Sequence, residues 1–194
     1  MIIKCYNENH PYLLFIDLEF FNNKDETSAH LVQFAGLLFK WVDEDTYQLM
    51  RSCNEYATDK VCYPFAEYTS ITNNFLIENG VPLRDMIMSI QEDFLGQIPL
   101  NEILIISHGL RNDRLVLLEN GLNFSTLSDN TSIDGYCTFE NARKILGRKD
   151  KLTLSDLAEE AGYYLHHAHN AYNDVWAEVS VFTYLKKVEE QEKK

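Results

Sequence analysis

The sequence lacks any apolar run of the roughly 20 residues that a membrane-spanning helix needs. Its N-terminal segment becomes polar after the third residue, which is not the pattern of a signal peptide. The four cysteines are scattered and form no C-x-x-C pair, as is usual in a reducing cytoplasm. We therefore expect a cytoplasmic protein with no membrane partner.

Basic residues are also scarce, with 17 Lys and Arg against 30 Asp and Glu and a formal net charge of −13. This balance argues against a protein that coats nucleic acid, because binding to phosphate depends on Lys and Arg. A nuclease remains compatible with it if part of the acidic excess surrounds bound cations.

No internal repeat or low-complexity linker divides the 194 residues, of which 45% are hydrophobic. A chain of this length can bury one sizeable core, so we expect a single domain over 1–194, with its core at about 12–188 and a charged C-terminal tail. A near-continuous apolar run at residues 12–18 predicts a strand that is buried on both faces. Further strands are expected at residues 31–42, 47–56, 103–107 and 132–139.

Helices are expected where apolar residues recur at three- and four-residue steps. Such segments are 82–94, a stretch ending near Asn120, two segments closed by Gly147 and Gly162, and 171–188. The order of elements predicts an α/β fold, in which a three-strand antiparallel meander joins further strands in a mixed sheet flanked by helices.

Acidic residues follow two of the predicted strands. Asp17 and Glu19 close the first strand, and residues i and i+2 of a strand point to the same face, so their carboxylates project together. An isolated D-x-E pair also fits a strand end that caps the next loop. Asp113 follows the strand at 103–107 and falls in or near the first turn of a helix. The helix dipole alone favours an Asp there, so neither position decides the function by itself.

A third polar site lies where the last helix begins, at His169 and Asp174. On a regular helix, residues five apart diverge by about 140°. The two side chains therefore converge only if His169 lies in the preceding loop or in a distorted first turn. With His166 and His167, His169 also suggests a zinc site, but no cysteine accompanies these residues and their spacing is not helical.

Together, the acidic residues lie at strand ends and helix starts, where open α/β sheets place ligand sites. Four carboxylates close together repel one another unless cations hold them. Oxygen ligands without thiolates favour Mg²⁺ or Mn²⁺, and two such ions about 4 Å apart are the recurring device for phosphoryl displacement. A nearby histidine can take a proton from attacking water. The set predicts phosphodiester hydrolysis with two divalent cations.

Three ordered motifs resemble those of the DnaQ-like, or DEDDh, 3′→5′ exonucleases of the ribonuclease H-like fold. They are F-I-D-L-E-F (15–20), S-H-G-L-R-N-D (107–113) and H-N-A-Y-N-D (169–174), the last of which matches the family pattern H-x-A-x-x-D. With weaker similarities between them, the match covers most of residues 12–188. The resemblance implies a twisted, mixed, five-stranded sheet and the removal of nucleotides from the 3′ end of single-stranded DNA or RNA.

The resemblance also implies a role for each residue. Asp17 would bridge both cations. Glu19 and Asp174 would help to hold the ion that binds the attacking water. Asp113 would support the second ion, and His169 would be the general base.

Beside two motifs the chain departs from the family pattern. Phe20 and Phe21 replace a polar pair that members use to seat the terminal nucleotide, and His108-Gly109 replaces the commoner His-Asn. We expect substrate contacts at Phe20, Phe21, His108 and Asn112. The rings of Phe20, Phe21 and Tyr136 are expected as stacking surfaces for a base. Ordinary core packing is the alternative for the Phe residues.

Five basic residues stand out in this acidic chain. They fit a patch that follows the phosphates of a substrate, and they also fit a helix C-terminus, where cations are favourable. They are Arg143, Lys144, Arg148, Lys149 and Lys151.

Two other functions are compatible with these sequence features. A catalytically idle copy would serve as a binding module, and its signature would be a lost carboxylate, whereas none is missing here. A phosphodiesterase acting on small nucleotides or oligonucleotides would use the same two-metal chemistry.

Overall fold

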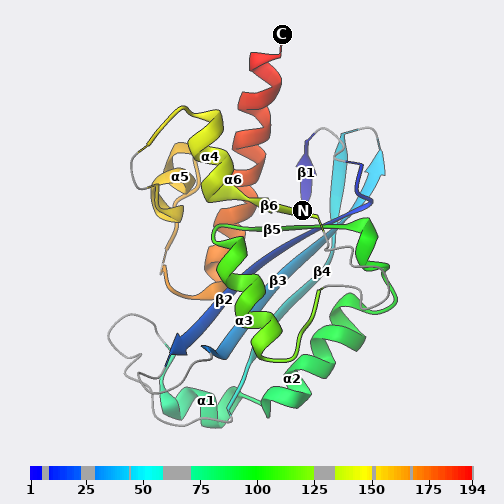
Figure 1. The fold of residues 1–194 in the computed structure, drawn as a ribbon, viewed down its shortest axis with the longest axis vertical. Coiled ribbons are helices and arrows are strands. Elements are labelled where there is room, and N and C mark those ends of the chain that lie inside the picture. The colour runs from blue at the N-terminus through cyan, green and yellow to red at the C-terminus, as the bar shows by residue number, and fades with distance from the viewer. Residues whose placement is uncertain are drawn as a thin grey trace.

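The computed structural model describes residues 1–5, 9–22, 29–43, 45–58, 71–124, 134–149, 152–166 and 168–193. A mixed sheet with the strand order β1-β4-β3-β2-β5-β6 forms its centre (Figure 1). Pairing is antiparallel from β1 through β4 and β3 to β2, and parallel from β2 through β5 to β6. The expected meander joined to parallel strands is thereby confirmed. The strands are β1 (Ile2–Lys4), β2 (Tyr12–Asn22), β3 (Ala29–Asp43), β4 (Thr46–Tyr56), β5 (Ile103–Ser107) and β6 (Gly135–Cys137).

The sheet has six strands, so the prediction of five is wrong by one. The additional strand is β1, which pairs with β4 at the edge of the sheet. Only Ile3 is buried, between the exposed Ile2 and Lys4, and a run this short has no periodicity that identifies a strand. β6 is shorter than expected because Thr138 already begins the next helix, and residues 132–133 lie outside the described ranges.

Most of the expected helices are confirmed. A π-helical segment, Ile90–Leu95, continues α2, and a 3-10 turn, Leu100–Glu102, leads into β5. Gly121 and Gly162 follow α3 and α5 with φ of +94° and +79°, a conformation that glycine adopts at little cost. None of the helices in the described ranges is both long and apolar enough to cross a bilayer. The helices are α1 (Asn73–Asn79), α2 (Leu83–Ser89), α3 (Leu110–Glu119), α4 (Thr138–Ile145), α5 (Leu154–Glu160) and α6 (Ala171–Glu192).

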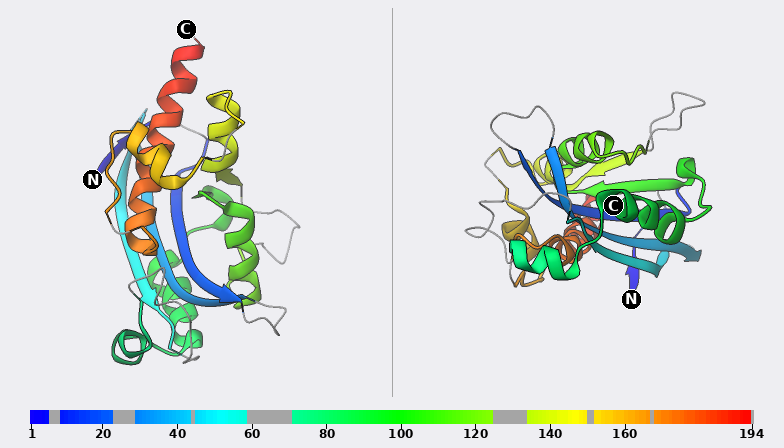
Figure 2. Two further views of the ribbon diagram at one scale, coloured as in Figure 1. Left: turned by 90° about the vertical axis from the view of Figure 1, so that its left-hand side faces the viewer. Right: turned by 90° about the horizontal axis from the view of Figure 1, so that it is seen from below.

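Helices cover both faces of the sheet, and alternate residues of β2 contribute to the two cores. Leu13 and Phe15 pack with α4, α5 and α6, whereas Leu14 and Ile16 pack with α2 and α3. Figure 2 shows α3 and α6 on opposite sides of β2. A strand that is buried on both faces is apolar at nearly every position, which explains the continuous apolar run at 12–18.

Candidate metal centre

The carboxylates of Asp17 and Glu19 lie near the end of β2, on the face covered by α6. They continue the alternation of Leu13 and Phe15, which are buried on that face. The parallel ladder between β2 and β5 ends at Phe15, so both acidic residues lie just beyond it, at the carboxyl ends of the two strands. This position is the usual ligand site of an open α/β sheet.

A β-bulge follows directly after Glu19. Glu19 is opposite Gln33, but Phe20 is opposite Leu31, so Val32 of β3 has no partner on β2. Bulges of this kind bend the strand and increase its local twist. The bulged strand is β3, and its extra residue lies opposite the step from Glu19 to Phe20, directly after the second carboxylate.

Gln33 of β3 attaches the start of α6 to the sheet. Its side chain is fully buried, and its Oε1 accepts a hydrogen bond from the backbone N–H of Ala171 at 3.1 Å. Its Nε2 donates to Asn54 Oδ1 at 2.8 Å and to Tyr56 Oη at 3.1 Å. Gln33 was not among the predicted site residues, although an uncharged polar residue within an apolar strand is a signal that could have identified it. By fixing the helix start, Gln33 positions Asp174.

His169 lies in the loop before α6, in the left-handed backbone conformation with φ of +67°. Asn170 is the N-cap, and Asp174 lies in the first turn of the helix. The backbone N–H of His169 donates to Asp174 Oδ2 at 3.0 Å. His169 therefore lies outside the regular helix, which is the condition under which its side chain can converge with that of Asp174. Asp174 is buried whereas His169 is exposed, so the imidazole is accessible to solvent.

Three of the predicted carboxylates come together. Asp17, Glu19 and Asp174 each offer an oxygen, and these three oxygens lie within 4.8 Å of one another. Among the residues that the structure describes, this is the grouping suited to a metal ion, and it includes no histidine or cysteine. The zinc alternative gains no support, because His166 is exposed and outside this group, and His167 lies outside the described residues.

Asp113 lies next to this group, on the first turn of α3, and is buried. Its Oδ2 accepts a hydrogen bond from Ser107 Oγ at the end of β5, and the same Oγ accepts the backbone N–H of Gly109 at 3.1 Å. Of the neighbouring charges, that of Asp113 acts most strongly on Asp17. The fourth carboxylate is thus adjacent to the group but not part of it.

Burial raises the pKa of all four carboxyl groups, and the charges of neighbouring carboxylates raise it further at Asp17 and Glu19. Burial raises the pKa of Asp17 well above its usual value, and the charges of its three acidic neighbours raise it further. Burial and the charge of Asp174 raise the pKa of Glu19 to about 7. Burial raises the pKa of Asp113 and of Asp174 to about 6. Ionising the site without a cation is therefore unfavourable.

The donor set fits a hard divalent cation. All four side chains offer carboxylate oxygens, which Mg²⁺ and Mn²⁺ prefer. Asp174 Oδ1 is buried and has no hydrogen-bond partner among the described residues. A buried polar atom without a partner is unfavourable, so this oxygen is free to bind a cation.

The metal-free protein is expected to lose stability as pH rises from about 4 to about 7, the span between the usual pKa of these carboxyls and the value of Glu19. In this window the folded state retains protons that the unfolded chain has released, so the slope of the unfolding free energy is negative. The shift at Asp113 from 3.8 to about 6 corresponds to about 3 kcal/mol. We expect Tm in EDTA to be roughly 5–10 °C lower at pH 8 than at pH 5.

Differential scanning fluorimetry measures this shift, and millimolar Mg²⁺ provides the comparison. With Mg²⁺, the fall in Tm between pH 5 and pH 8 should largely disappear, because the cation stabilises the ionised form. A metal-free Tm that rises over the same interval would contradict the electrostatics described for the four carboxyls.

The two predicted aromatic contacts lie in different surroundings. Phe20 is half-buried and packs against the core on the α2 and α3 face, which is opposite to the face that carries the carboxylates. Phe21 stacks on His30, with ring centroids 4.8 Å apart. Core packing therefore accounts for Phe20 and for the buried Tyr136, whereas Phe21 forms part of a half-buried pair of stacked rings.

The second motif contributes two further predicted contacts. His108 is half-buried, and both of its ring nitrogens have partners, Thr138 Oγ1 at 2.9 Å and the carbonyl oxygen of Leu152 at 3.2 Å. These contacts join the end of β5 to α4 and to the segment before α5. Asn112 is exposed on the first turn of α3.

The basic segment has local partners. Arg148 pairs with Glu160 at 2.5 Å, and Arg143 donates to the carbonyl oxygen of Lys149 at 3.3 Å. The last turn of α4 carries basic residues, as expected for cations at a helix C-terminus. Lys151 lies outside the described residues. These contacts fit the helix-end interpretation.

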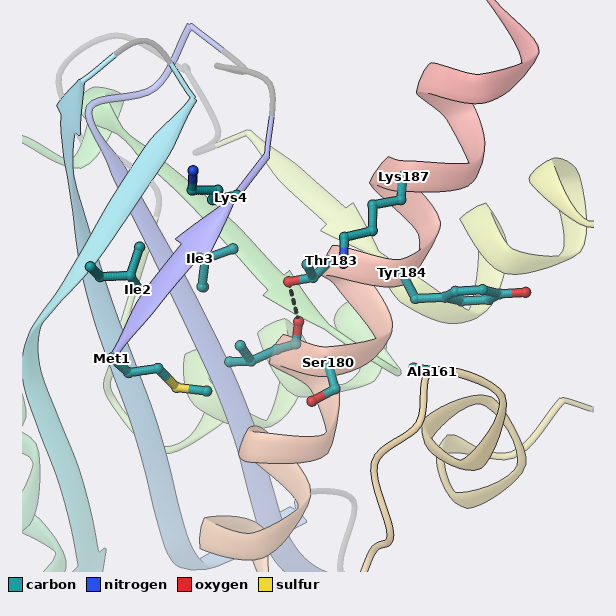
Figure 3. Close-up of a pocket in the computed structure, with 10 residues that line it drawn as sticks. Met1, Ile2, Ile3, Lys4, Ala161, Ser180, Thr183, Tyr184 and Lys187 are labelled. Carbon is teal, nitrogen blue, oxygen red and sulfur yellow. Dashed lines mark hydrogen bonds between the residues drawn. The ribbon is translucent and has the colours of Figure 1, made fainter.

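A pocket of about 460 Å³ lies between β1 and α6 and includes none of the predicted site residues (Figure 3). Its lining offers no carboxylate and no imidazole. The hydroxyl of Thr183 donates to the carbonyl oxygen of Val179 at 2.8 Å, the contact dashed in Figure 3. The hydroxyl hydrogen of Thr183 therefore forms a hydrogen bond within α6. The pocket contributes no ligand to the candidate metal centre.

The fold agrees with the architecture expected from the sequence motifs. A mixed sheet with helices on both faces and acidic residues at the ends of its parallel strands is the architecture implied by the resemblance to DnaQ-like exonucleases. No protein-family model and no curated protein sequence matches the chain. Solved structures, however, match its fold.

The nuclease domain of 3′hExo, a DEDDh family member bound to rAMP, is similar with a TM-score of 0.65 and 12% identity, over 93% of this chain and 94% of that one. S. pombe Pop2p in its Mg²⁺- and Mn²⁺-bound form is similar with a TM-score of 0.60 and 13% identity, over 93% and 84%. Cell-death related nuclease 4 gives 0.64 and 13%, over 91% of this chain but 64% of that one. The chain therefore shares the fold of these solved structures. Identities this low establish the fold and not the activity.

Proposed function

We propose that this chain is a divalent-metal-dependent 3′→5′ exonuclease acting on single-stranded RNA or DNA. The observation that carries the proposal is the group of Asp17, Glu19 and Asp174, whose oxygens lie within 4.8 Å of one another on the fold of known nucleases. Asp113 lies beside the group, and His169 is held at its margin by Asp174. These five residues are the proposed catalytic set, and residues 1–194 would act as one exonuclease domain.

Each residue has a proposed role that follows from its position. Asp17 has acidic neighbours on several sides and would be shared between two cations, Mg²⁺ or Mn²⁺. Glu19 and Asp174 would hold the first cation and Asp113 the second. When bound, the cations would lower the pKa of the attacking water and offset charge on the phosphate.

His169 would accept the proton from the attacking water. Its backbone is fixed by the hydrogen bond to Asp174, while its side chain is exposed and can reach a substrate that enters from solvent. A general base has to lie within hydrogen-bond reach of the proton that it takes. The loop position before α6 allows the ring to approach from the solvent side without occupying a ligand position.

A substrate strand would end at the carboxylates. Neighbours with this fold include a nuclease domain bound to rAMP, which supports a nucleotide as the ligand here. The stacked rings of Phe21 and His30 offer a surface for a base, and the exposed Asn112 offers a polar contact. The scattered cysteines, none of them in a C-x-x-C pair, support the proposal of a cytoplasmic protein.

Digestion of matched single-stranded RNA and DNA oligomers tests the proposal. With Mg²⁺ or Mn²⁺, a 5′-labelled strand should shorten progressively, a 3′-labelled strand should release labelled mononucleotide at once, and EDTA should stop both reactions. A circular single strand is the control, because it has no 3′ end and should remain intact.

The same assay separates the alternatives. Cleavage of dinucleotides without shortening of longer strands would favour a small-oligonucleotide phosphodiesterase. Binding of a strand without cleavage under any divalent ion would favour an idle binding module. Cutting of the circular strand would contradict the exonuclease assignment.

A further inference from the structure

Glu178 is a buried acidic residue close to the candidate metal centre. It lies one helical turn beyond Asp174 on α6, and residues four apart share a helix face. Its side chain is 0% exposed. The charges of Asp17 and Asp113 act on it, followed by that of Asp174. Glu178 therefore adds a fifth carboxylate to the four that the sequence motifs predict.

The two oxygens of Glu178 have different surroundings. Oε1 accepts a hydrogen bond from the backbone N–H of His108 at 2.8 Å, directly after the end of β5. Oε2 is buried and has no hydrogen-bond partner among the described residues. The buried Lys186 on the same helix does not neutralise it, because that ammonium pairs with Glu189 at 3.0 Å and lies over the ring of Tyr136.

This arrangement is unfavourable unless a further group is bound. A buried charge without a partner costs several kcal/mol. A neutral carboxyl would need an acceptor for its O–H, and Oε2 has no acceptor among the described residues. A cation near Asp17 and Asp113 would satisfy the oxygen and offset the repulsion at the same time.

We propose that Glu178 is a fifth carboxylate of the metal centre, in which Oε2 binds the cation held near Asp17 and Asp113, directly or through one water. The hydrogen bond from the backbone N–H of His108 to Oε1 would hold the same side chain against the end of β5. The inference rests on the metal centre proposed above. It assigns a cation-binding role to a residue outside the three sequence motifs.

The test is Mn²⁺ binding to the full chain without substrate, by isothermal titration calorimetry, with Glu178→Gln as the variant. Gln retains the size of Glu and an oxygen that can accept the N–H of His108, but it removes the charge. We expect the affinity for Mn²⁺ to fall roughly 10- to 100-fold, the usual effect of losing an outer partner of a metal site. In EDTA, Tm should stay equal to that of the wild type or increase, because a buried repulsive charge is gone. Glu192→Gln, an exposed position on the same helix, is the control and should bind Mn²⁺ as the wild type does.

The outcomes separate the inference from the proposed function. If wild type binds Mn²⁺ and Glu178→Gln binds it with equal or higher affinity, Glu178 only supports the backbone of His108, and the inference is wrong. If wild type does not bind Mn²⁺ or Mg²⁺ at all, the proposed function fails together with it. A weaker Mn²⁺ affinity combined with an unchanged or higher metal-free Tm supports the inference, since loss of a structural hydrogen bond would lower that Tm.

Discussion

Replacing Asp17 with Asn is expected to reduce kcat by roughly 10³-fold or more, because stabilisation of transition-state charge by metal ions is worth several kcal/mol and each 1.36 kcal/mol is a factor of ten. Asn retains the size of Asp and one oxygen but loses the negative charge. Asp17 is within reach of Glu19 and Asp174 and under the charge of Asp113. Asp17 is thus the one predicted ligand on which the charges of the other three predicted carboxylates all act. Loss of the Asp17 charge should therefore weaken both proposed cation positions.

Single-turnover digestion of a 5′-labelled strand, with Mn²⁺ near saturation, measures this loss. Asp85→Asn, at an exposed position on α2, makes the same chemical change away from the site and should leave the rate unaltered. The metal-free Tm of Asp17→Asn should increase, because a charge repelled by its acidic neighbours is removed. A variant with a high Tm and near-wild-type turnover would remove Asp17 from the metal-binding set.

Replacing His169 with Asn should lower kcat by about 10²- to 10⁴-fold, the usual contribution of a general base, and leave Mn²⁺ affinity unchanged. Asn is preferred to Ala as the test, because position 169 has a φ of +67° and Asn tolerates the left-handed conformation better than most residues. The backbone N–H that donates to Asp174 is present in both proteins. The variant should therefore differ from wild type only in the side chain that takes the proton.

The comparison for His169 is His166→Asn, which changes an exposed histidine outside the carboxylate group. Turnover and Mn²⁺ affinity are measured for both variants. Full activity in His169→Asn would assign proton removal to another group. A parallel fall in kcat and Mn²⁺ affinity would indicate that residue 169 supports the ligands instead of acting as a base.

Local patterns were sufficient to predict the strands and helices that carry the motifs. The alternation along β2 placed Asp17 and Glu19 on one face, and glycine positions marked the ends of α3 and α5. β1 was missed because three residues with one buried side chain carry no periodic signal. Its stability as a strand comes from pairing with β4, more than 40 residues later in the chain.

The parts of the site that the sequence did not predict depend on contacts between distant segments. Gln33 and Ala171 are 138 positions apart, and Glu178 and His108 are 70 positions apart. A polar residue in an apolar strand or helix indicates that a partner exists but does not identify it. The approach of His169 to Asp174 likewise depends on a left-handed residue before α6, which helical periodicity does not encode.

The alternation of β2 also makes the proposed activity sensitive to strand alignment. A slip of β2 by one residue against β3 would turn its side chains to opposite faces, so Asp17 and Glu19 would point into the core around Met86 and Ile90. Leu18 would take their place beside α6. The bulge at Val32 breaks the uniformity of the ladder, and a shifted pairing would not reproduce it. A misaligned molecule would thus bury two charges and lose two of its proposed metal ligands together, so metal binding would report correct strand pairing as well as an intact site.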